Sequence, residues 1–353
     1  MLTILVLGGT GAMGVHLVDL LSRDPDNRIT VTSRSHREGK GNVSYIQGNV
    51  HDMDFLSTLL RGKYDVIVDF MVYGTEEFRE RYKMLLASCW QYVYLSSSRV
   101  YAYSETPITE ESPRLLDVTE DMEYLNTDEY ALTKARQENL LRESGYARWT
   151  IIRPYITYSE IRLQLGILEK ENWLYRALRN RTMIFSKDIA KHWTTLTYGH
   201  DVAYGMAALI GRVEALGEAF HITVSETIHW SEVLDIYLEV LEKRIGRRPK
   251  VLLTDSSLDL RYGWGRYQLK YDRLFDRRFD NDKISRFVDV NTFKKPQEGL
   301  RLCLEQFLEH PSFRNPSWRR EARYDRFVRE RASLREIPTI KQKVGYLLYR
   351  YII

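Results

Sequence analysis

The chain has 353 residues, of which 44% are hydrophobic and 28% charged, a composition typical of a soluble globular protein with room for two domains. It contains no uncharged apolar run long enough to cross a membrane, so no membrane-spanning helix is expected. Cys89 and Cys303 lie too far apart for a metal motif and are too few for a disulfide framework, which favours a reducing, cytoplasmic location.

The net charge of +4 is unevenly distributed along the chain. Residues 311–353 carry 11 Lys or Arg and 4 Asp or Glu, whereas the rest of the chain carries 41 basic and 44 acidic residues. A basic tail can contact a membrane, a nucleic acid or an acidic partner, but such segments are usually a solvated surface. We therefore expect a near-neutral body followed by a basic C-terminal tail.

The start of the chain has the pattern of a βαβ unit. Leu2 to Leu7 form a nearly continuous apolar run, as expected of a strand buried on both faces of a parallel sheet. A glycine-rich turn follows at residues 8–14, then a helical pattern from Val15 to Leu21 and a β-branched run from Arg28 to Thr32. Strand, glycine turn, helix and strand in this order are typical of a dinucleotide-binding fold.

Three glycines in the turn, Gly8, Gly11 and Gly14, have a spacing that suits phosphate binding. One lets the chain turn tightly, one lets the backbone approach a pyrophosphate, and one lets the helix pack closely on the strand. The N–H groups at the start of the following helix would then face the phosphates. The residues expected to contact the cofactor here are Gly8, Thr10, Gly11, Ala12, Met13 and Gly14.

The end of the second strand indicates which cofactor binds. NAD sites have an acidic residue here for the ribose 2′-hydroxyl, whereas NADP sites have arginine or small polar residues for the 2′-phosphate. This chain has Ser33 and Arg34, and no acidic residue before Glu38. Arg34 can pair with a phosphate through charge-assisted hydrogen bonds. We therefore predict NADP rather than NAD, with Ser33 and Arg34 near the 2′-phosphate.

The alternation of strands and helices continues along the chain. The predicted elements are strands at Val43–Ile46, Tyr64–Phe70, Gln91–Leu95 and Trp149–Arg153, and helices near 53–61 and 76–88. Repeated βα units predict an α/β fold, a Rossmann-like, doubly wound parallel sheet with helices on both faces. Ligands bind beyond the carboxyl ends of such strands. The residues expected there, on the adenine and ribose side, are Asn49, Val50, Phe70, Met71 and Val72.

A serine-rich strand end and a Tyr-x-x-x-Lys pair indicate a catalytic site. The fifth strand ends in three serines at 96–98, at the carboxyl edge of the sheet. Tyr130 and Lys134 share a face of a helix that Asn126 or Thr127 would cap. This is the only such pair in the chain, but about one is expected by chance, so the spacing alone is weak. The order of glycine turn, βα units, serines and helix makes the pair a catalytic candidate.

Several motifs, taken in order, resemble those of a known family. They are Gly8-x-x-Gly11-x-x-Gly14, Ser96 to Tyr101, Tyr130-x-x-x-Lys134, Arg153-Pro154 and His200-Asp201-Val202-Ala203. This set resembles the extended short-chain dehydrogenases/reductases and, more narrowly, the NAD(P)-dependent epimerase/dehydratase family. The resemblance covers about the first 225 residues well and extends more loosely to about residue 310.

The resemblance implies roles for individual residues. Tyr130 would be the acid/base, Lys134 would lower the pKa of this tyrosine and hold the nicotinamide ribose, and Ser97 would hydrogen-bond the reacting oxygen. Pro154 and Ile156 would lie at the carboxamide edge of the nicotinamide. Family members commonly pair through the helices at Tyr130 and near 76–88, so the resemblance also implies a homodimer.

Two departures from the family pattern bear on the function. In the 4,6-dehydratases the catalytic Ser or Thr is followed by Asp-Glu, which drives elimination of water; here these positions are Ser98 and Arg99, so dehydration is not expected. Epimerisation and ketone reduction both remain open. The fourth strand continues into Phe70-Met71-Val72 instead of an alanine-rich ending, as in an atypical branch that includes the chloroplast stem-loop RNA-binding proteins.

The predicted function is that of an NADP-dependent oxidoreductase or epimerase acting on a sugar, carried by a nucleotide, of the sort used in bacterial surface polysaccharides. The alternative is a non-catalytic NADP-binding or RNA-binding protein of the atypical branch. An intact set of Ser97, Tyr130 and Lys134 argues against a pure binding protein, which needs no activated phenol. Nucleic-acid binding is therefore not expected.

The domain organisation follows from where the sheet pattern stops. Residues 1–158, completed by about 188–225, are assigned to the dinucleotide-binding domain. Residues 159–187 and 226–310 are assigned to a smaller, mostly helical substrate-binding region, and residues 311–353 to the basic tail.

The substrate-binding region contains a basic, aromatic stretch from Arg261 to Arg278. Arginine binds phosphate and tyrosine stacks on bases, so this stretch suits a nucleotide diphosphate, although an exposed salt-bridged surface is equally compatible. His200 has no second ligand nearby, so a structural role is preferred and no metal is expected. The substrate candidates are Ser98, Arg99, Tyr155, Trp173, Arg266 and Tyr267.

The tail is predicted to contain a strongly charged helix from Trp318 to Glu336. Its last residues, Val344 to Ile353, are aromatic and aliphatic beside basic side chains, which suits the headgroup region of a membrane. The same segment suits docking on the body of the chain or on a subunit partner, and packing is preferred.

Overall fold

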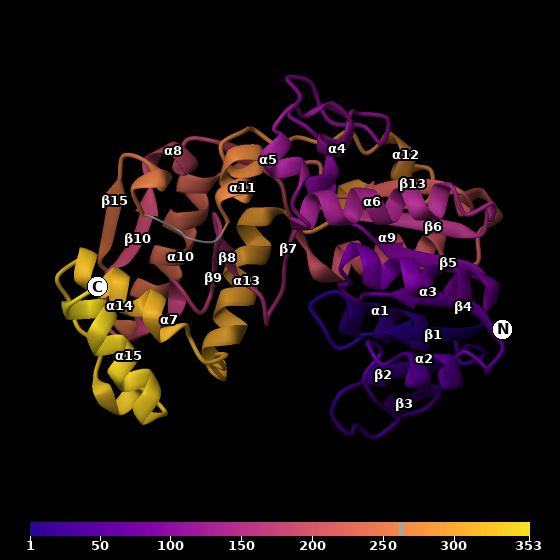
Figure 1. Ribbon diagram of the computed structural model, residues 1–353, viewed down its shortest axis with the longest axis horizontal. Helices are drawn as coiled ribbons and strands as arrows, with labels where there is room; N and C mark the ends of the chain where they lie inside the picture. Colours follow the sequence, from indigo (N-terminus) through magenta and orange to yellow (C-terminus); the bar gives the residue numbers. More distant parts are fainter. Residues whose placement is uncertain (261–264) are drawn as a thin grey trace. The chain divides into compact units, whose positions relative to one another are not determined.

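Seven parallel strands form the central sheet of the computed structural model, which describes residues 1–260 and 265–353 (Figure 1). Their spatial order is β13-β6-β5-β4-β1-β2-β3. The Rossmann-like, doubly wound sheet expected from the sequence is thus confirmed. The strands are β1 (Thr3–Leu7), β2 (Arg28–Ser33), β3 (Val43–Gln47), β4 (Tyr64–Asp69), β5 (Cys89–Leu95), β6 (Trp149–Pro154) and β13 (Glu218–Ile222).

The central strands are apolar on both faces, which explains why they assemble in the middle of the sheet. In the register of β1, Val6 lies between Val31 of β2 and Val68 of β4, and all three side chains are buried. A parallel strand covered by helices on both sides is expected to be a continuous apolar run, as residues 4–7 are.

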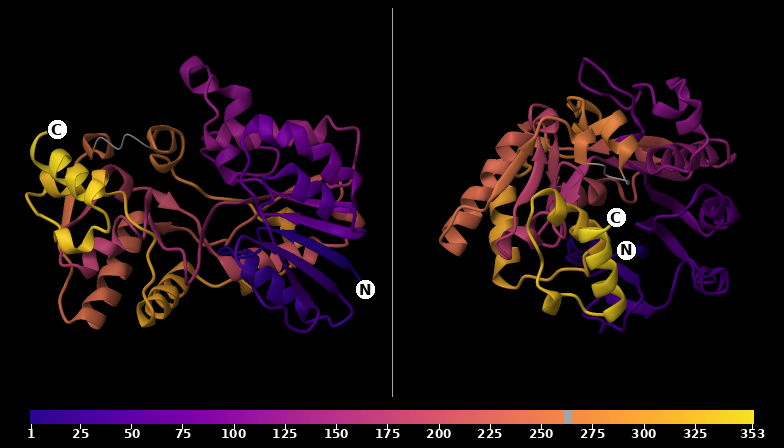
Figure 2. Two further views of the ribbon diagram at one scale, coloured as in Figure 1. Left: turned by 60° about the horizontal axis from the view of Figure 1, so that its bottom comes forward. Right: turned by 60° about the vertical axis from the view of Figure 1, so that its left-hand side comes forward.

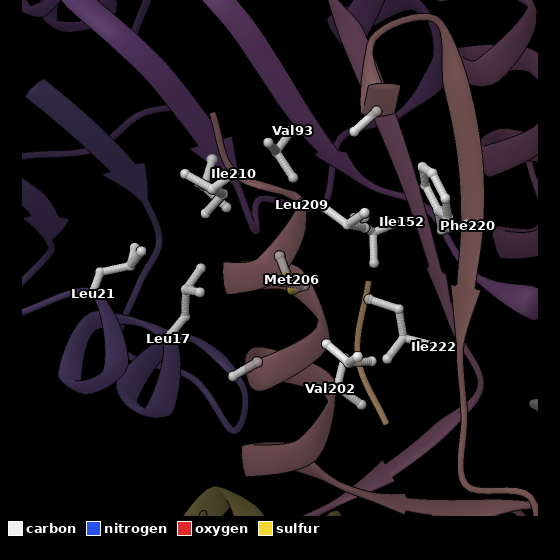
Figure 3. Packing of buried hydrophobic residues seen from close by; sticks show 14 of the residues in the cluster. Leu17, Leu21, Val93, Ile152, Val202, Met206, Leu209, Ile210, Phe220 and Ile222 are labelled. Atoms are coloured by element: carbon white, nitrogen blue, oxygen red, sulfur yellow. The ribbon is translucent and has the colours of Figure 1, made fainter. Parts of the chain in front are cut away.

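Helices cover both faces of the sheet. One face packs against α1 (Gly14–Ser22) and α9 (Gly199–Leu209), and the other against α2 (Met53–Leu59), α3 (Thr75–Ala87) and α6 (Tyr130–Arg142). Figure 3 shows the first of these cores, where Leu17 of α1 and Met206 of α9 lie among side chains of the strands. The two cores hold the carboxyl ends of the strands in fixed positions.

The strand order reverses between β1 and β4. From β1 the chain proceeds outward through β2 to β3, then crosses to β4 and proceeds the other way through β5 and β6. In open α/β sheets, ligands bind outside the carboxyl ends of the strands at such a reversal. The glycine-rich turn follows β1 at this position.

The chain divides into two compact units. The sheet unit comprises residues 1–159, 195–227 and 277–296, and the helical unit comprises residues 160–194, 228–276 and 297–353. Residues 277–296, which the sequence assigned to the substrate-binding region, belong to the sheet unit. The tail is part of the helical unit and does not stand apart from it.

Further elements complete both units. In the sheet unit they are β7 (Ile156–Tyr158), β12 (Leu196–Tyr198), α4 (Leu115–Val118), α5 (Met122–Leu125) and α12 (Asp282–Ser285). The helical unit contains α7 (Leu174–Leu178), α8 (Lys187–Ala190), α10 (Trp230–Ile245), α11 (Arg266–Gln268), α13 (Pro296–Glu309), α14 (Trp318–Phe327), α15 (Ile340–Tyr351) and the strands β8 (Gln164–Leu165), β9 (Leu168–Glu169), β10 (Met183–Ser186), β11 (Trp193–Thr194), β14 (Ile228–His229) and β15 (Val251–Thr254). Within the described parts of the chain, no helix is both long and apolar enough to span a membrane.

Two helix boundaries differ from those expected. The N-cap of α6 is Glu129, whose carboxylate accepts a hydrogen bond from the N–H of Ala131 at 2.8 Å, because Asn126 and Thr127 are occupied at the end of α5. The charged helix predicted from Trp318 to Glu336 ends at Phe327 instead. Arg329, with φ of 57°, lies in the left-handed region, which a continuous helix does not tolerate.

Candidate active site

The glycine-rich turn connects β1 to α1, and its glycines are needed for different physical reasons. Gly8 has φ of +72°, a conformation that favours glycine. A Cβ on Gly14 would lie 2.7 Å from the Cα of Gly9, so this glycine allows α1 to approach the turn. A Cβ on Gly11 would meet nothing within 4 Å, so one side of the turn is open for a ligand.

The amino end of α1 is available to an anion. Its N-cap, Met13, makes no side-chain capping hydrogen bond, and its first turn contains no acidic residue. The first N–H groups of a helix carry a partial positive charge and can bind phosphate oxygens. Nearby, Thr157 of β7 donates to the sulfur of Met13 at 3.7 Å, which brings the β6–β7 segment with Pro154 and Ile156 beside the turn.

The residues predicted for the adenosine end lie after β2, β3 and β4. Arg34 is exposed directly after β2, while Ser33 is buried and accepts a hydrogen bond from the N–H of Ser35 at 3.3 Å. Asn49 and Val72 are exposed, whereas Val50 is buried. The partly buried pair Phe70 and Met71 reaches the turn, where a Cβ on Gly8 would lie 2.9 Å from the Met71 sulfur.

The three serines after β5 are not equivalent. The hydroxyl of Ser96 donates to Glu138 at 2.6 Å, and that of Ser98 donates to the carbonyl of Arg153 at 2.7 Å. Ser97 accepts a hydrogen bond from the N–H of Arg99 at 3.2 Å, and no acceptor among the described residues takes its proton. Ser97 is therefore the one serine of the three whose hydroxyl can donate to a ligand.

Tyr130 and Lys134 occupy the first two turns of α6, which packs against the short 3-10 helix Ser98–Val100. The Tyr130 side chain is 36% exposed, whereas Lys134 is buried. The Lys134 ammonium lies 5.9 Å from the centre of the Tyr130 ring and donates to the carbonyl of Leu95 at 2.7 Å. Two of its three protons are not used by any described residue and could bind ribose hydroxyls.

The electrostatic environment of Lys134 is unusual for a lysine. Burial lowers its pKa to about 8, while the nearby carboxylates of Asp69 and Glu138 act in the opposite direction. Asp69 is itself buried at the end of β4, where it accepts hydrogen bonds from the hydroxyls of Tyr92 at 2.8 Å and Tyr73 at 3.1 Å. Burial raises the pKa of Asp69, although these hydrogen bonds and Lys134 oppose the rise.

A second cation lies beside the Tyr130 ring. The guanidinium of Arg99 is 5.5 Å from the ring centre and forms an ion pair with Glu129 at 2.6 Å. The other carboxylate oxygen of Glu129 accepts from Tyr124 at 3.1 Å and from the N–H of Ala131. Glu129 thus orients Arg99 and starts the helix that carries Tyr130. The sequence predicted Arg99 only as a substrate contact.

A buried ion pair holds α6 one turn beyond Lys134, on the same face of the helix. Glu138 accepts two hydrogen bonds from Arg153 of β6, at 2.8 and 2.7 Å, and one from Ser96. Burial opposes ionisation of Glu138, but the Arg153 guanidinium and these hydrogen bonds hold its pKa below the ordinary value. Asp69 and Glu138 were not predicted as site residues from the sequence, although an aspartate within an apolar strand is a signal for the first.

The remaining substrate candidates differ in placement. Tyr155 is buried in the sheet unit, where its ring lies 5.2 Å from that of Phe279. Trp173 is fully buried in the core of the helical unit, stacked on Tyr237 with 4.4 Å between ring centres. Arg266 is exposed and packs on the ring of Tyr267 in the same unit.

Other sequence predictions are placed as follows. The first part of the basic, aromatic stretch, residues 261–264, lies outside the described residues. His200 packs edge-on against His16 and bonds Asp201 at 3.2 Å, and no cluster that could hold a metal ion is found in residues 1–260 and 265–353. Ser98, expected at the substrate, is fully buried with its hydroxyl bonded to the backbone.

The sequence matches a family of nucleotide-binding proteins. A family model described as NAD(P)H-binding matches residues 8–191, which is more than half of the chain. No curated protein matches the sequence.

Solved structures with a similar fold include sugar-modifying enzymes. An epimerase from Methanothermobacter thermautotrophicus has a TM-score of 0.66 at 16% identity, over 87% of this chain and 92% of that chain. UDP-glucuronic acid 4-epimerase from Bacillus cereus, in complex with UDP-glucuronic acid and NAD, has a TM-score of 0.64 at 18% identity, over 87% and 100% of the two chains. dTDP-glucose 4,6-dehydratase from Bacillus anthracis, in complex with NAD, has a TM-score of 0.64 at 16% identity, over 88% and 97%. The present chain belongs to the NAD(P)H-binding family, and its fold is that of the extended short-chain dehydrogenases/reductases.

Proposed function

We propose that the protein is an NADP-dependent oxidoreductase or epimerase that acts on a nucleotide-linked sugar. The observation that carries the proposal is the arrangement around Tyr130, whose partly exposed ring lies beside two cations, Lys134 and Arg99. A phenol is a poor base near neutral pH, and adjacent positive charge favours the phenolate form that can accept a proton. A binding protein would have no use for this arrangement.

The residues around the glycine-rich turn fit a dinucleotide. The open side of Gly11 and the uncapped amino end of α1 suit the pyrophosphate, and the exposed Arg34 suits a 2′-phosphate. When bound there, the nicotinamide supplies hydride transfer to or from the carbon that carries the reacting oxygen.

The side chains of the protein then handle the proton on that oxygen. Tyr130 accepts the hydroxyl proton as the alcohol becomes a ketone and returns it in the reverse direction. Ser97, whose proton is available, donates a hydrogen bond to the same oxygen as negative charge develops. Lys134 offers its two remaining protons to the nicotinamide ribose and favours the Tyr130 phenolate.

Epimerisation and ketone reduction both use this set, whereas elimination of water needs a base for a proton on carbon. Arg99 is a cation paired with Glu129, and the Ser98 hydroxyl is bonded to the Arg153 carbonyl, so neither residue supplies such a base. We therefore include dehydration only as an outcome to be tested, since a dehydratase is among the similar folds.

Cofactor binding tests the first part of the proposal. Nicotinamide fluorescence and thermal shift would be measured with NADPH and NADH for the wild type, Arg34→Ala and the neighbouring Arg37→Ala as a control. We expect NADPH to bind more tightly and Arg34→Ala to weaken it about 10- to 100-fold, the value of a charge-assisted hydrogen bond, with little change for NADH or for Arg37→Ala. Failure of both cofactors to bind would overturn the proposal that the protein is a nicotinamide-dependent enzyme.

Turnover tests the second part. UDP- and dTDP-sugars would be screened for epimerised, reduced or dehydrated products, using the wild type, Tyr130→Phe and the exposed Tyr204→Phe on α9. We expect Tyr130→Phe to lower kcat about 10²- to 10⁴-fold while retaining cofactor affinity, as for loss of a general acid/base. Equal activity of the two variants would exclude Tyr130 as the acid/base.

A further inference from the structure

The last helix of the chain, α15, exposes a continuous apolar face. Its members are spaced at intervals of three and four residues, with one adjacent pair, so they lie along one side of the helix. Ile340 is 79% exposed and Val344 is 53% exposed, so both side chains present most of their apolar surface to solvent. We call this face the α15 stripe, and its members are Ile340, Val344, Leu347, Leu348 and Tyr351.

The opposite face of α15 holds the helix in place. Tyr346 is fully buried; its hydroxyl donates to Asp325 of α14 at 2.6 Å and accepts from the N–H of Ala332 at 2.8 Å. The guanidinium of Arg323 lies 5.0 Å from the centre of the Tyr349 ring. The views in Figure 2 agree that α14 and α15 lie side by side. Because this face is anchored, the α15 stripe points away from the helical unit.

Charges in the tail are segregated. All four acidic residues of 311–353 form ion pairs with basic residues of the same unit, and those pairs are Glu321 and Asp325 with Arg176 and Arg181, Glu330 with Lys250, and Glu336 with Arg179. Most of the 11 basic residues of the same segment remain at the surface. The tail therefore presents positive charge to its surroundings.

The stripe is bordered by cations. On a helical wheel, Lys341 lies along one border, and Lys343 and Arg350 lie along the other, and α15 contains no acidic residue. The helix has 12 residues, which is a length of about 18 Å, too short to cross a bilayer. An apolar stripe between basic borders is the pattern of a helix that lies in the plane of a membrane surface.

We propose that the α15 stripe and its basic surround bind the surface of a membrane that contains anionic lipid. The stripe would enter the boundary between headgroups and acyl chains, and the lysines and arginines would reach the phosphates. A second copy of the chain fits less well, since it would bring two surfaces of like charge together without exposed carboxylates to pair with them. Nucleic acid would leave the apolar stripe uncovered. The proposal does not depend on the enzymatic activity.

Vesicle flotation with the full chain tests this proposal. We expect binding to vesicles of phosphatidylcholine with phosphatidylglycerol, weaker binding at high salt, and little binding to phosphatidylcholine alone. The double variant Val344→Ser/Leu347→Ser should lower the partition coefficient about tenfold or more, since it removes exposed apolar groups without changing charge. The matched control is Val213→Ser in the sheet unit, which changes a valine that is 69% exposed and should bind like the wild type.

A charge variant gives an independent readout should the serine variant be unstable. The double variant Lys341→Gln/Arg331→Gln neutralises one border lysine and an exposed arginine of the loop between α14 and α15. It should reduce binding to anionic vesicles about tenfold and flatten the salt dependence, since each basic group near the surface contributes separately. Wild-type binding that is absent, or is unchanged in both double variants, would overturn the proposal. So would light scattering that shows a wild-type dimer lost in Val344→Ser/Leu347→Ser, or binding of single-stranded RNA that depends on Arg331 but not on Val344.

Discussion

In the sheet unit, Arg153 of β6 binds Glu138 of α6, whereas in the helical unit Arg176 and Arg181 bind Glu321 and Asp325 of α14. Both clusters are buried, and both join segments by charge-assisted hydrogen bonds. The first lies one turn beyond Lys134 and so orients the helix face that carries the candidate chemistry. The second lies far from any candidate catalytic residue in sequence and attaches the C-terminal helices to α7. Buried ion pairs thus position the candidate active site in the sheet unit and hold helices together in the helical unit.

Removing one arginine from each cluster would test this difference most strongly. Arg153→Met and Arg176→Met should each destabilise their own unit by about 3–5 kcal/mol, because a buried carboxylate loses a partner. Hydrogen exchange measured segment by segment would locate the loss in residues 1–159 for the first variant and in residues 297–353 for the second.

The two variants should differ in function. Arg153→Met should also lower kcat of the proposed reaction, whereas Arg176→Met should leave NADPH binding unchanged and weaken vesicle binding. Arg23→Met, which breaks the exposed pair with Asp19, is the control and should change stability by less than about 1 kcal/mol. If Arg176→Met impaired cofactor binding as much as Arg153→Met, the proposed division of roles would be wrong.

A smaller effect distinguishes packing from ligand binding within the sheet unit. Gly14→Ala should destabilise the protein by about 1–3 kcal/mol, since the added Cβ would lie 2.7 Å from the Gly9 backbone. Gly11→Ala meets no protein atom within 4 Å, so thermal unfolding without cofactor should be nearly unchanged. It should still weaken NADPH binding, because the open side of the turn is where the pyrophosphate is proposed to lie. Unchanged NADPH affinity in Gly11→Ala would count against that placement.

The smallest expected effect is a shift in pH dependence. Because burial lowers the pKa of Lys134 to about 8, the cation beside Tyr130 is lost above about that pH, and kcat should fall there. Asp69→Asn removes an attractive charge, so the pKa of Lys134 should fall further and the decline should begin up to about one pH unit lower. An identical pH profile for this variant and the wild type would show that Asp69 does not act through Lys134.

Stability should follow the opposite trend. The folded chain favours neutral Lys134, so the unfolded chain binds more protons between about pH 8 and the ordinary lysine value of 10.5. The free energy of unfolding attributable to this residue therefore rises with pH across this window and is lost again on return to pH 8. Denaturant titrations of the wild type and Lys134→Met between about pH 8 and pH 10 would measure how much of the pH dependence of the free energy of unfolding is due to Lys134.

Local patterns predicted the sheet well. Apolar runs, glycine spacing and the Tyr130–Lys134 pair are short-range features, and each predicted strand lies within a few residues of its observed bounds. The choice of Ser97 among three serines came from resemblance alone, and the hydrogen bonds of Ser96 and Ser98 now give it a physical reason. These side chains bond to residues on other elements, which a local pattern does not reveal.

The remaining features depend on contacts between distant residues. Trp173 is a residue type often found at substrate sites, but here it packs in the core against Tyr237 of another helix. No local pattern indicates that acidic residues of the tail are buried in ion pairs, because their partner arginines lie some 140 residues earlier in the sequence. The N-cap of α6 was misplaced because α5, a single turn, ends just before it.

The path of the chain also has a consequence during synthesis. The edge of β6 is covered only when β13 pairs with it, and β13 follows the excursion of residues 160–194 into the helical unit. Residues 277–296 then return to the sheet unit after a second excursion. A nascent chain that has emerged only as far as residue 217 therefore presents β6 as an open edge, where other unfinished chains could pair. The sheet unit is completed only late in translation. The yield of folded protein in a cell should therefore depend on how long β6 remains unpaired before β13 is synthesised.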